Sequence, residues 1–186
     1  MARLLGISGS LRNGSYNTAL LRAARERCPE GTTLDIATLH GIPLYDGDVE
    51  AASGVPEAVN ALKQQVVASD GVLLATPEYN NGVPGVLKNA IDWLSRPPDD
   101  IPRVFHGRPF ALLGASPGGF GTILAQDAWL PVLRTLRAGF WSGGRLMVSR
   151  AGKAFDAQGQ LQDEAVLDQL GRFLAGFAAH CDRHAH

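Results

Sequence analysis

The chain has 186 residues, 45% of them hydrophobic and 19% charged, and a formal net charge of -1 at pH 7. The length is enough for one domain with a sizeable core, so we expect residues 1–186 to form a single domain. The near-neutral charge argues against a nucleic-acid-binding surface and against membrane binding through basic residues. No stretch is as long as a membrane span, and the apolar run 4–7 is too short for a signal peptide. The two cysteines, Cys28 and Cys181, fit a reducing compartment. We therefore expect a cytoplasmic protein.

Apolar segments typical of strands alternate with segments of helical spacing. Strands are predicted at 4–7, 33–38, 72–75, 110–115 and 140–149, the last weakened by two glycines. Helices are predicted from residue 18 to a Cys-Pro stop, from 56 to 68, and at 85–94, 122–137 and 163–181. This alternation predicts an α/β fold, a doubly wound five-stranded parallel sheet with helices on both faces.

Two segments fall outside this pattern. Residues 40–56 are polar and rich in glycine and proline, so we expect a loop that lies over a surface or a partner. Residues 182–186 are expected to fray, and the histidines there lack the spacing of metal ligands.

Three loops rich in small and polar residues follow predicted strands one, three and four, at 8–17, 76–84 and 116–121. In an open α/β sheet, ligands bind beyond the carboxyl ends of the strands, where the strand order reverses. For the strand order 2-1-3-4-5, that point lies between strands one and three. The first two loops should meet there, with the third one strand away.

The first loop joins a buried strand to a helix, and the free amides of a first helical turn attract anions. Ser10 and Ser15 add hydroxyl donors, and Arg12 adds a planar cation that suits phosphate. These residues with Asn17 suit a terminal phosphate monoester, such as that of FMN. The alternative is that Ser15 or Asn17 simply caps the helix.

Other phosphate-binding motifs are absent from this loop. Ser8 and Leu11 stand where a dinucleotide fingerprint starting at Gly6 would have glycines, and no Lys-Ser/Thr pair completes a P-loop. The pattern therefore favours a mononucleotide over a dinucleotide or a nucleoside triphosphate.

The second loop, 76–84, has prolines near both ends, which make it rigid. Glu78 and Asn80 could contact the ribityl chain or the ring of a flavin. Alternatively, they cap the helix at 85–94 or stay solvated. Asn81 suits a turn before glycine. Glu78 has no partner in the sequence that indicates general acid–base catalysis.

The third loop presents almost bare backbone, because Ser116 is followed by Gly118 and Gly119. Glycine lets backbone approach a flat ring closely, although a plain turn would use glycine too. No Ser/His/Asp set, Cys/His set or metal-ligand cluster is found, so we expect neither a catalytic side chain nor a metal. Such a site fits chemistry that a cofactor supplies.

Two motifs, Gly9-Ser-Leu-Arg-Asn-Gly-Ser-Tyr-Asn17 and Thr76-Pro-Glu-Tyr-Asn-Asn-Gly-Val-Pro-Gly-Val-Leu-Lys-Asn-Ala-Ile-Asp-Trp93, resemble those of the NAD(P)H-dependent FMN reductase family. This flavodoxin-like family includes quinone, chromate and azo-dye reductases. The resemblance implies non-covalent FMN, NADH or NADPH as donor, a small-molecule acceptor, and a homodimer or homotetramer. The implied cofactor-binding residues are Gly9, Ser10, Leu11, Arg12, Ser15, Tyr16, Asn17, Pro77, Glu78, Tyr79, Asn80, Ser116, Gly118 and Gly119.

The function that these observations predict is hydride transfer from a nicotinamide to FMN and then to the acceptor, by a ping-pong mechanism. The rival is a flavodoxin-type electron carrier, but such carriers are usually strongly acidic. A second rival is a scaffold that has lost its cofactor. The sequence leaves open the acceptor, the choice of NADH or NADPH, and the oligomeric state. Arg103 and Arg108 are the candidates for binding a 2′-phosphate.

Overall fold

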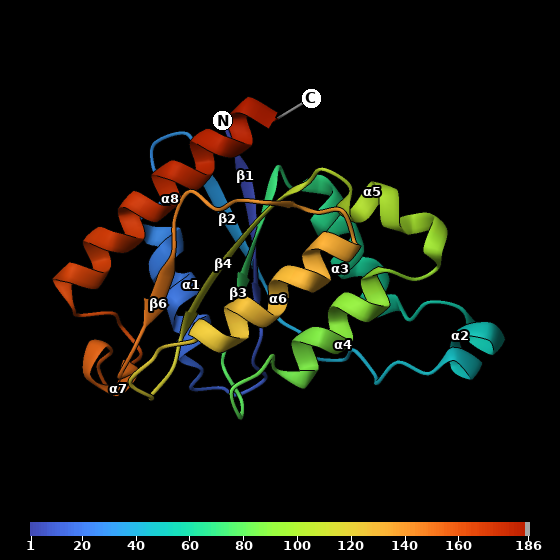
Figure 1. The fold of residues 1–186 in the computed structure, drawn as a ribbon, viewed down its shortest axis with the longest axis horizontal. Coiled ribbons are helices and arrows are strands. Elements are labelled where there is room, and N and C mark those ends of the chain that lie inside the picture. Colours follow the sequence, from blue (N-terminus) through green and yellow to red (C-terminus); the bar gives the residue numbers. More distant parts are fainter. Residues whose placement is uncertain (185–186) are drawn as a thin grey trace.

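A parallel sheet runs through the centre of the molecule, with helices on both faces (Figure 1). In the computed structural model, which describes residues 1–184, the strand order is β2-β1-β3-β4-β5, and β6 also pairs with β4. The predicted order 2-1-3-4-5 is therefore confirmed. All of these strand pairs are parallel, as predicted. The strands are β1 (Arg3–Ser8), β2 (Thr33–Ala37), β3 (Gly71–Ala75), β4 (Pro109–Ala115), β5 (Gly139–Phe140) and β6 (Leu146–Val148).

Two short strands, β5 and β6, share the fifth position of the sheet, each paired with β4. The prediction of one continuous strand at 140–149 is therefore wrong, because the residues between β5 and β6 are not in a strand. The chain leaves the sheet there and Trp141 is buried, its ring centroid 5.1 Å from that of Phe173. A Cβ on Gly143 would lie 2.5 Å from the Trp141 ring, and one on Gly144 would lie 2.7 Å from it. The glycines that weakened the strand prediction make room for this tryptophan.

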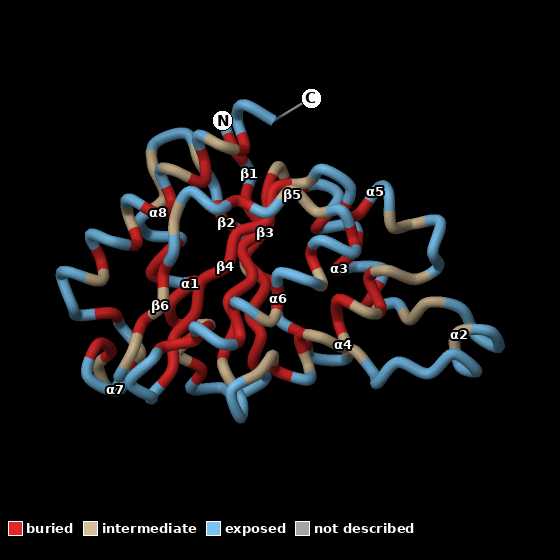
Figure 2. Tube along the Cα trace, viewed as in Figure 1, coloured by how far each residue is buried: buried red, intermediate tan, exposed pale blue. Residues whose placement is uncertain are grey.

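The long helices form two layers. Helices α1 (Tyr16–Glu26) and α8 (Glu164–His184) cover one face, while α3 (Glu57–Ala68), α4 (Gly85–Leu94) and α6 (Ile123–Thr135) cover the other (Figure 1). Side chains of each central strand alternate between the two cores, as the two-residue period of a strand requires. Figure 2 shows the buried strands between the exposed outer sides of the helices.

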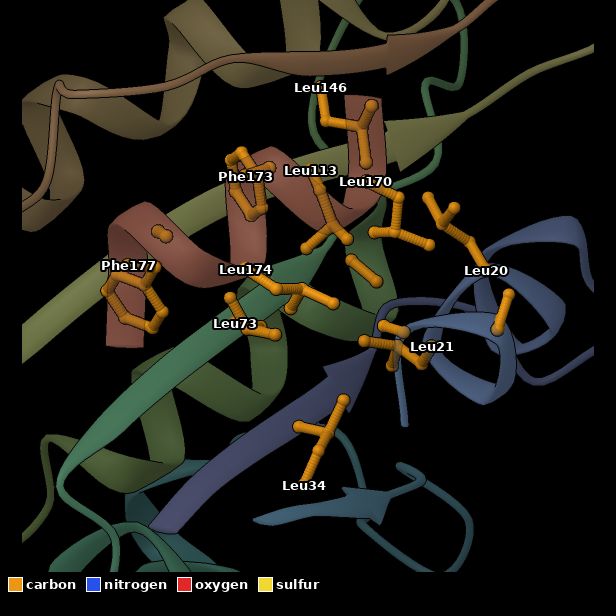
Figure 3. Close-up of a cluster of buried hydrophobic side chains, with 14 of the residues drawn as sticks. Leu20, Leu21, Leu34, Leu73, Leu113, Leu146, Leu170, Phe173, Leu174 and Phe177 are labelled. Atoms are coloured by element: carbon orange, nitrogen blue, oxygen red, sulfur yellow. The ribbon is translucent and has the colours of Figure 1, made fainter. Parts of the chain in front are cut away.

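Figure 3 shows one of the two cores. Leu20 and Leu21 of α1 meet Leu170 and Leu174 of α8 above Leu73 of β3. These side chains are buried, and burial of apolar surface on both sides of the sheet is the main stabilising term of such a fold.

Short helices occupy segments that the sequence leaves as loops. They are α2 (Gly47–Ser53), the 3₁₀ turn η1 (Pro98–Asp100), α5 (Ile101–Phe105) and α7 (Ala151–Ala154). Such pieces are too short to show a helical period. None of the α2 residues is buried, and the helix begins because the Asp46 side chain accepts from the backbone N–H of Asp48 at 2.8 Å.

The polar segment before α2 lies along α4. The backbone N–H of Tyr45 donates to Asn89 Oδ1 at 2.8 Å, and Trp93 Nε1 donates to the Pro43 carbonyl at 2.9 Å. An ion pair of 2.8 Å joins Arg96 to Glu50 in α2. The expectation that 40–56 lies over a surface is therefore confirmed, although part of it is helical.

The carboxyl-terminal helix is longer than predicted. It continues to His184, so fraying of residues 182–184 is a wrong prediction, while residues 185–186 lie outside the described part of the chain. The amino group of Met1 forms a 3.0 Å ion pair with Asp182, which no local sequence pattern could indicate. No helix within residues 1–184 is long and apolar enough to cross a membrane.

A buried lysine anchors the segment between α4 and β4. The Lys63 side chain is only 1% exposed, and its Nζ donates to Asp100 Oδ2 and to the Arg96 carbonyl, each at 2.6 Å. Asp100 also accepts from Arg103 at 2.7 Å. Arg103 and then Lys63 lower the pKa of Asp100 to about 2.

The low pKa of Asp100 predicts how stability depends on pH. Because the folded-state pKa lies below the ordinary value of 3.8, the ionised carboxylate stabilises the fold above about pH 4, and this contribution is lost as pH falls toward 2. We expect Asp100→Asn to lower the free energy of unfolding at pH 7 by about 2 kcal/mol. Urea unfolding at pH 7 and at several lower pH values measures this, with Asp99→Asn as the exposed control. Equal midpoints for the two variants would contradict the assignment.

Candidate cofactor site

The loops after β1, β3 and β4 converge at the carboxyl edge of the sheet, the lower edge in Figure 1. The backbone N–H of Gly9 donates to the Ala75 carbonyl at 2.9 Å. A Cβ on Gly9 would lie 2.8 Å from Pro77 Cδ and 2.9 Å from the Ala75 oxygen. Glycine at this position therefore allows the first two loops to touch.

The three loops enclose a cleft of about 240 Å³. It is lined by Ser10, Arg12, Ser15, Tyr16, Asn17, Pro77, Glu78, Tyr79, Ala115, Ser116 and Pro117. The structure thus brings together predicted residues from all three loops. Of the predicted residues, Gly9, Leu11, Asn80, Gly118 and Gly119 lie outside the lining. Sequence reasoning missed Ala115 and Pro117, whose only signal was their position on either side of Ser116.

The first loop presents hydroxyls at this cleft. Ser10 and Ser15 are 6% and 5% exposed. Ser10 Oγ accepts from the backbone N–H of Arg12 at 3.3 Å and lies 3.4 Å from the Tyr79 hydroxyl. Ser15 caps α1 by accepting from the backbone N–H of Thr18 at 3.3 Å. The capping role is therefore real, and it places the hydroxyl at the start of α1, where the helix attracts anions.

Arg12 is the cation of the lining. Its guanidinium donates to the Gly14 carbonyl at 2.5 Å and lies 5.8 Å from the centre of the Tyr16 ring. No acidic side chain occupies the first turn of α1. The charge of Arg12 and the positive end of the helix are therefore not neutralised by a carboxylate in this loop.

Asn17 lies in the lining, but its side-chain amide is already bonded. Nδ2 donates to the Ala115 carbonyl and Oδ1 accepts from the Ala115 N–H, both at 2.9 Å, and the residue is 3% exposed. The side chain joins the first loop to the end of β4 and positions both. The prediction that Asn17 helps to hold the phosphate stays a prediction. Its backbone N–H, in the first turn of α1, and the second hydrogen of Nδ2 are the donors left for that role.

Glu78 caps a helix, but not the predicted one. Its Oε2 accepts from the backbone N–H groups of Leu124 and Ala125, at 2.9 and 3.0 Å, in the first turn of α6. The N-cap residue Thr122 makes no side-chain capping bond. The carboxylate therefore fastens the second loop to α6, which corrects the alternative that it caps residues 85–94 or stays solvated.

Residues 79–82 form a tight hairpin. The backbone N–H of Tyr79 donates to the Gly82 carbonyl at 3.2 Å, and the N–H of Gly82 donates to the Tyr79 carbonyl at 3.0 Å. Asn80 and Asn81 have φ angles of 50° and 60°, as a type I′ turn requires. The prediction of Asn81 as a turn residue is confirmed, and Asn80 has the same role.

The third loop leaves open space beside the cleft. Ser116 Oγ accepts from the Gly118 N–H at 3.0 Å, and the Ser116 N–H donates to the Val148 carbonyl at 3.0 Å. A Cβ on Gly119 would meet no atom within 4 Å, and its φ is not positive. Neither packing nor conformation requires glycine at 119, so its small size leaves room for a ligand.

These features fit a flavin mononucleotide. The buried hydroxyls, Arg12 and the start of α1 supply donors for a phosphate, while the rigid second loop and the bare third loop suit a flat ring.

The predicted 2′-phosphate residues are at the wrong edge of the sheet. The Arg108 guanidinium donates to the carbonyls of Val104 and Ser69, and Arg103 pairs with Asp100. Both arginines precede β4, so they lie at the amino edge, away from the cleft. The prediction that they bind a 2′-phosphate is therefore wrong. Both arginines instead stabilise the fold through these contacts.

A hollow of about 430 Å³ lies at the amino edge of the sheet. It is lined by Arg3, Asp35 and other residues, and none of the predicted site residues is among them.

Comparison with known proteins shows the family of this chain. The family model of NADPH-dependent FMN reductases matches residues 2–153. An NAD(P)H-dependent FMN reductase of Pseudomonas aeruginosa is 49% identical over 172 residues, 92% of this chain and 91% of the relative. A quinone reductase of Escherichia coli K12 is 36% identical over 183 residues, 97% of this chain and 96% of the relative.

Solved structures show the same fold. The flavoenzyme NAD(P)H:acceptor oxidoreductase FerB of Paracoccus denitrificans has a TM-score of 0.85 at 32% identity, covering 99% of both chains. A WrbA-like flavodoxin of Agrobacterium tumefaciens has a TM-score of 0.61 at 17% identity, again over 99% of both. The fold is flavodoxin-like, and the chain belongs to the NADPH-dependent FMN reductase family.

The first prediction from this geometry concerns Arg12. We expect Arg12→Ala to weaken FMN binding by about 1.5–3 kcal/mol, because it removes a charge-assisted donor from a dianionic group. Titration of the apo-protein with FMN, followed by quenching of flavin fluorescence, measures the loss. Arg25→Ala, on the exposed side of α1, is the control. An unchanged affinity in Arg12→Ala would remove this residue from the site.

The second prediction concerns Glu78. We expect Glu78→Ala to lower the free energy of unfolding of the apo-protein by about 1 kcal/mol, because two amides of α6 lose their acceptor. Glu78→Gln keeps an acceptor oxygen and should retain much of that stability. We also expect Glu78→Gln to keep the pH dependence of turnover. Loss of one limb of the pH profile would instead give the carboxylate an acid–base role.

Proposed function

We propose that this protein keeps FMN bound non-covalently in the three-loop cleft and transfers electrons from NADH or NADPH to small acceptors. The observation that carries the proposal is the arrangement of the cleft, with Ser10, Ser15 and the start of α1 on one side and the open backbone near Gly119 on another. Family membership supports NAD(P)H-dependent FMN or quinone reductase activity.

Quinones are the acceptors that the comparisons favour. The E. coli relative is named a quinone reductase, and a 36% identical relative from Burkholderia is named a 2-hydroxy-1,4-benzoquinone reductase. Chromate and azo dyes are further acceptors to assay, since the sequence resemblance includes their reductases. A flavoenzyme fits this range because one reduced ring can serve several acceptors.

The role of the chain is binding and orientation. Bound FMN would supply the redox chemistry, which is to take up hydride from the reduced nicotinamide and to pass the electrons to an acceptor. Ser10, Ser15 and Arg12 would hold the phosphate, and the backbone of the second loop would lie along the ring. Glu78 Oε2 is bonded to α6 and the Asn17 amide to β4, so both side chains position the loops. Catalysis therefore rests on position.

The predicted kinetic consequence is a ping-pong mechanism. In this cleft the protein would leave one face of the ring open, so donor and acceptor would have to use that face in turn. We expect parallel double-reciprocal lines when a quinone is varied at several NAD(P)H concentrations. In anaerobic stopped-flow mixing, NAD(P)H alone should bleach the bound flavin.

Two outcomes would contradict this prediction. Intersecting lines would mean that both substrates bind together. A flavin that stays oxidised under NAD(P)H would mean that the protein takes its electrons from a partner, as a flavodoxin-type carrier does.

The thiols support the location that we propose, the cytoplasm. Cys28 and Cys181 are both free. Burial raises the pKa of Cys181 to about 12, so it stays a protonated thiol inside the core. Free thiols and a need for reduced nicotinamide both suit a reducing compartment.

We also propose a homodimer or homotetramer with the cleft near a subunit boundary. Helix α2 buries none of its residues and projects from the body of the molecule (Figure 1). Leu44 beside it is 83% exposed, and Val49 is 45% exposed. An ordered arm with exposed apolar side chains is suited to packing against a second copy of the chain.

The expected result is a dimer or larger assembly in multi-angle light scattering at micromolar concentration. A Leu44→Asp/Val49→Asp double variant should shift the equilibrium toward monomer. Val67→Asp, an exposed position on α3, serves as control. A wild-type monomer with full activity would overturn the proposed assembly.

A further inference from the structure

Arg150 has an unusual backbone conformation at the rim of the cleft. It precedes α7 with φ 47° and ψ 45°, the left-handed region that glycine adopts without strain. Two bonds impose this geometry. The Arg150 N–H donates to the Gly118 carbonyl at 2.9 Å, and the Ala151 N–H donates to the Ser116 carbonyl at 3.0 Å. Glycine could form the same bonds, so the fold itself does not require an arginine here.

The Arg150 side chain makes no visible contribution to the fold. It is exposed, and within residues 1–184 it makes neither a hydrogen bond nor an ion pair. Lys153 follows on α7, where its N–H donates to the Arg150 carbonyl at 2.8 Å. Its own side chain is also exposed. Two cations are thus left free on one short segment.

This segment bridges the two sides of the cleft. Arg150 is bonded to the third loop, and a Cβ on Gly152 would lie 3.4 Å from the hydroxyl of Tyr16, a lining residue from the first loop. Helix α7 lies at the same end of the sheet as the loops (Figure 1). The lining itself contains one cation, Arg12, which the bound mononucleotide would use.

The electron donor, NADH or NADPH, carries more negative charge than Arg12 alone can neutralise. A nicotinamide dinucleotide carries a diphosphate bridge, and NADPH has a further 2′-phosphate, while the nicotinamide must enter the cleft. Those phosphates must lie outside the cleft, and an arginine fork suits them. We propose that Arg150, assisted by Lys153, binds a phosphate of the nicotinamide dinucleotide at the cleft rim. This inference rests on the proposed function.

The left-handed backbone provides a sharp test, because Arg150→Gly removes the cation and relieves strain at once. The matched control is Arg137→Gly, since Arg137 is also exposed and has φ 54°, but lies in the turn between α6 and β5 at the amino edge. We expect both variants to keep or raise the thermal unfolding midpoint and to keep wild-type FMN affinity. Arg150→Gly alone should raise the KM for the dinucleotide, roughly tenfold, with little change in kcat.

Binding without turnover separates this inference from the proposed function. Calorimetry with ADP and with 2′,5′-ADP measures phosphate binding in the FMN-loaded protein whether or not it oxidises NAD(P)H. Weaker binding of both probes to Arg150→Gly, with a raised KM for NADH and NADPH alike, indicates the diphosphate. An effect confined to 2′,5′-ADP and NADPH indicates the 2′-phosphate.

Three results would overturn the inference. These are wild-type probe affinity and KM in Arg150→Gly, an equal loss in Arg137→Gly, and a loss of FMN affinity alone. If Arg150→Gly is unstable, Arg150→Gln keeps the backbone conformation and removes only the charge, and the same criteria apply to it.

Discussion

The buried amide of Asn17 forms the interaction on which the cleft depends. It bonds to both backbone groups of Ala115 and so holds the start of α1 against the end of β4. The close approach at Gly9 then brings the second loop against the first. Glu78 completes the arrangement by fastening the second loop to α6. Bonds within the protein thus hold together three loops from distant parts of the chain, and loops held in this way lower the ordering cost of binding.

The same bonds separate the polar residues that hold the loops in place from those that remain available to a ligand. The two sequence motifs place Asn17 and Glu78 among the flavin-binding residues, yet both side chains bond to backbone elsewhere in the fold. The hydroxyls of Ser10 and Ser15 and the guanidinium of Arg12 remain at the cleft surface. These hydroxyls, this cation and the backbone amides are the groups that we propose to bind FMN, which would supply the reactive atoms.

Local patterns were enough to predict the parallel α/β sheet and most of the long elements, and the strand order 2-1-3-4-5 is that of the flavodoxin-like fold that the chain resembles. Helix α4 has the predicted bounds because proline precedes it and its apolar face is regular. Contacts between distant residues decided the rest. Burial of Trp141 divides the fifth strand, and the ion pair between Met1 and Asp182 supports the end of α8. The partner of Glu78 could not be foreseen, since α6 begins more than forty residues later.

The central claim is that FMN is a resident group in this cleft and not a dissociating substrate. The most direct measurement is quinone-dependent NAD(P)H oxidation by extensively dialysed protein with no added flavin, alongside the flavin content of the same sample. The account predicts about one FMN per chain, released by denaturation, and a rate that added FMN does not raise. The contrary result is dialysed protein that contains no flavin and no activity, and whose activity returns with a hyperbolic dependence on the concentration of added FMN. That result would contradict the claim.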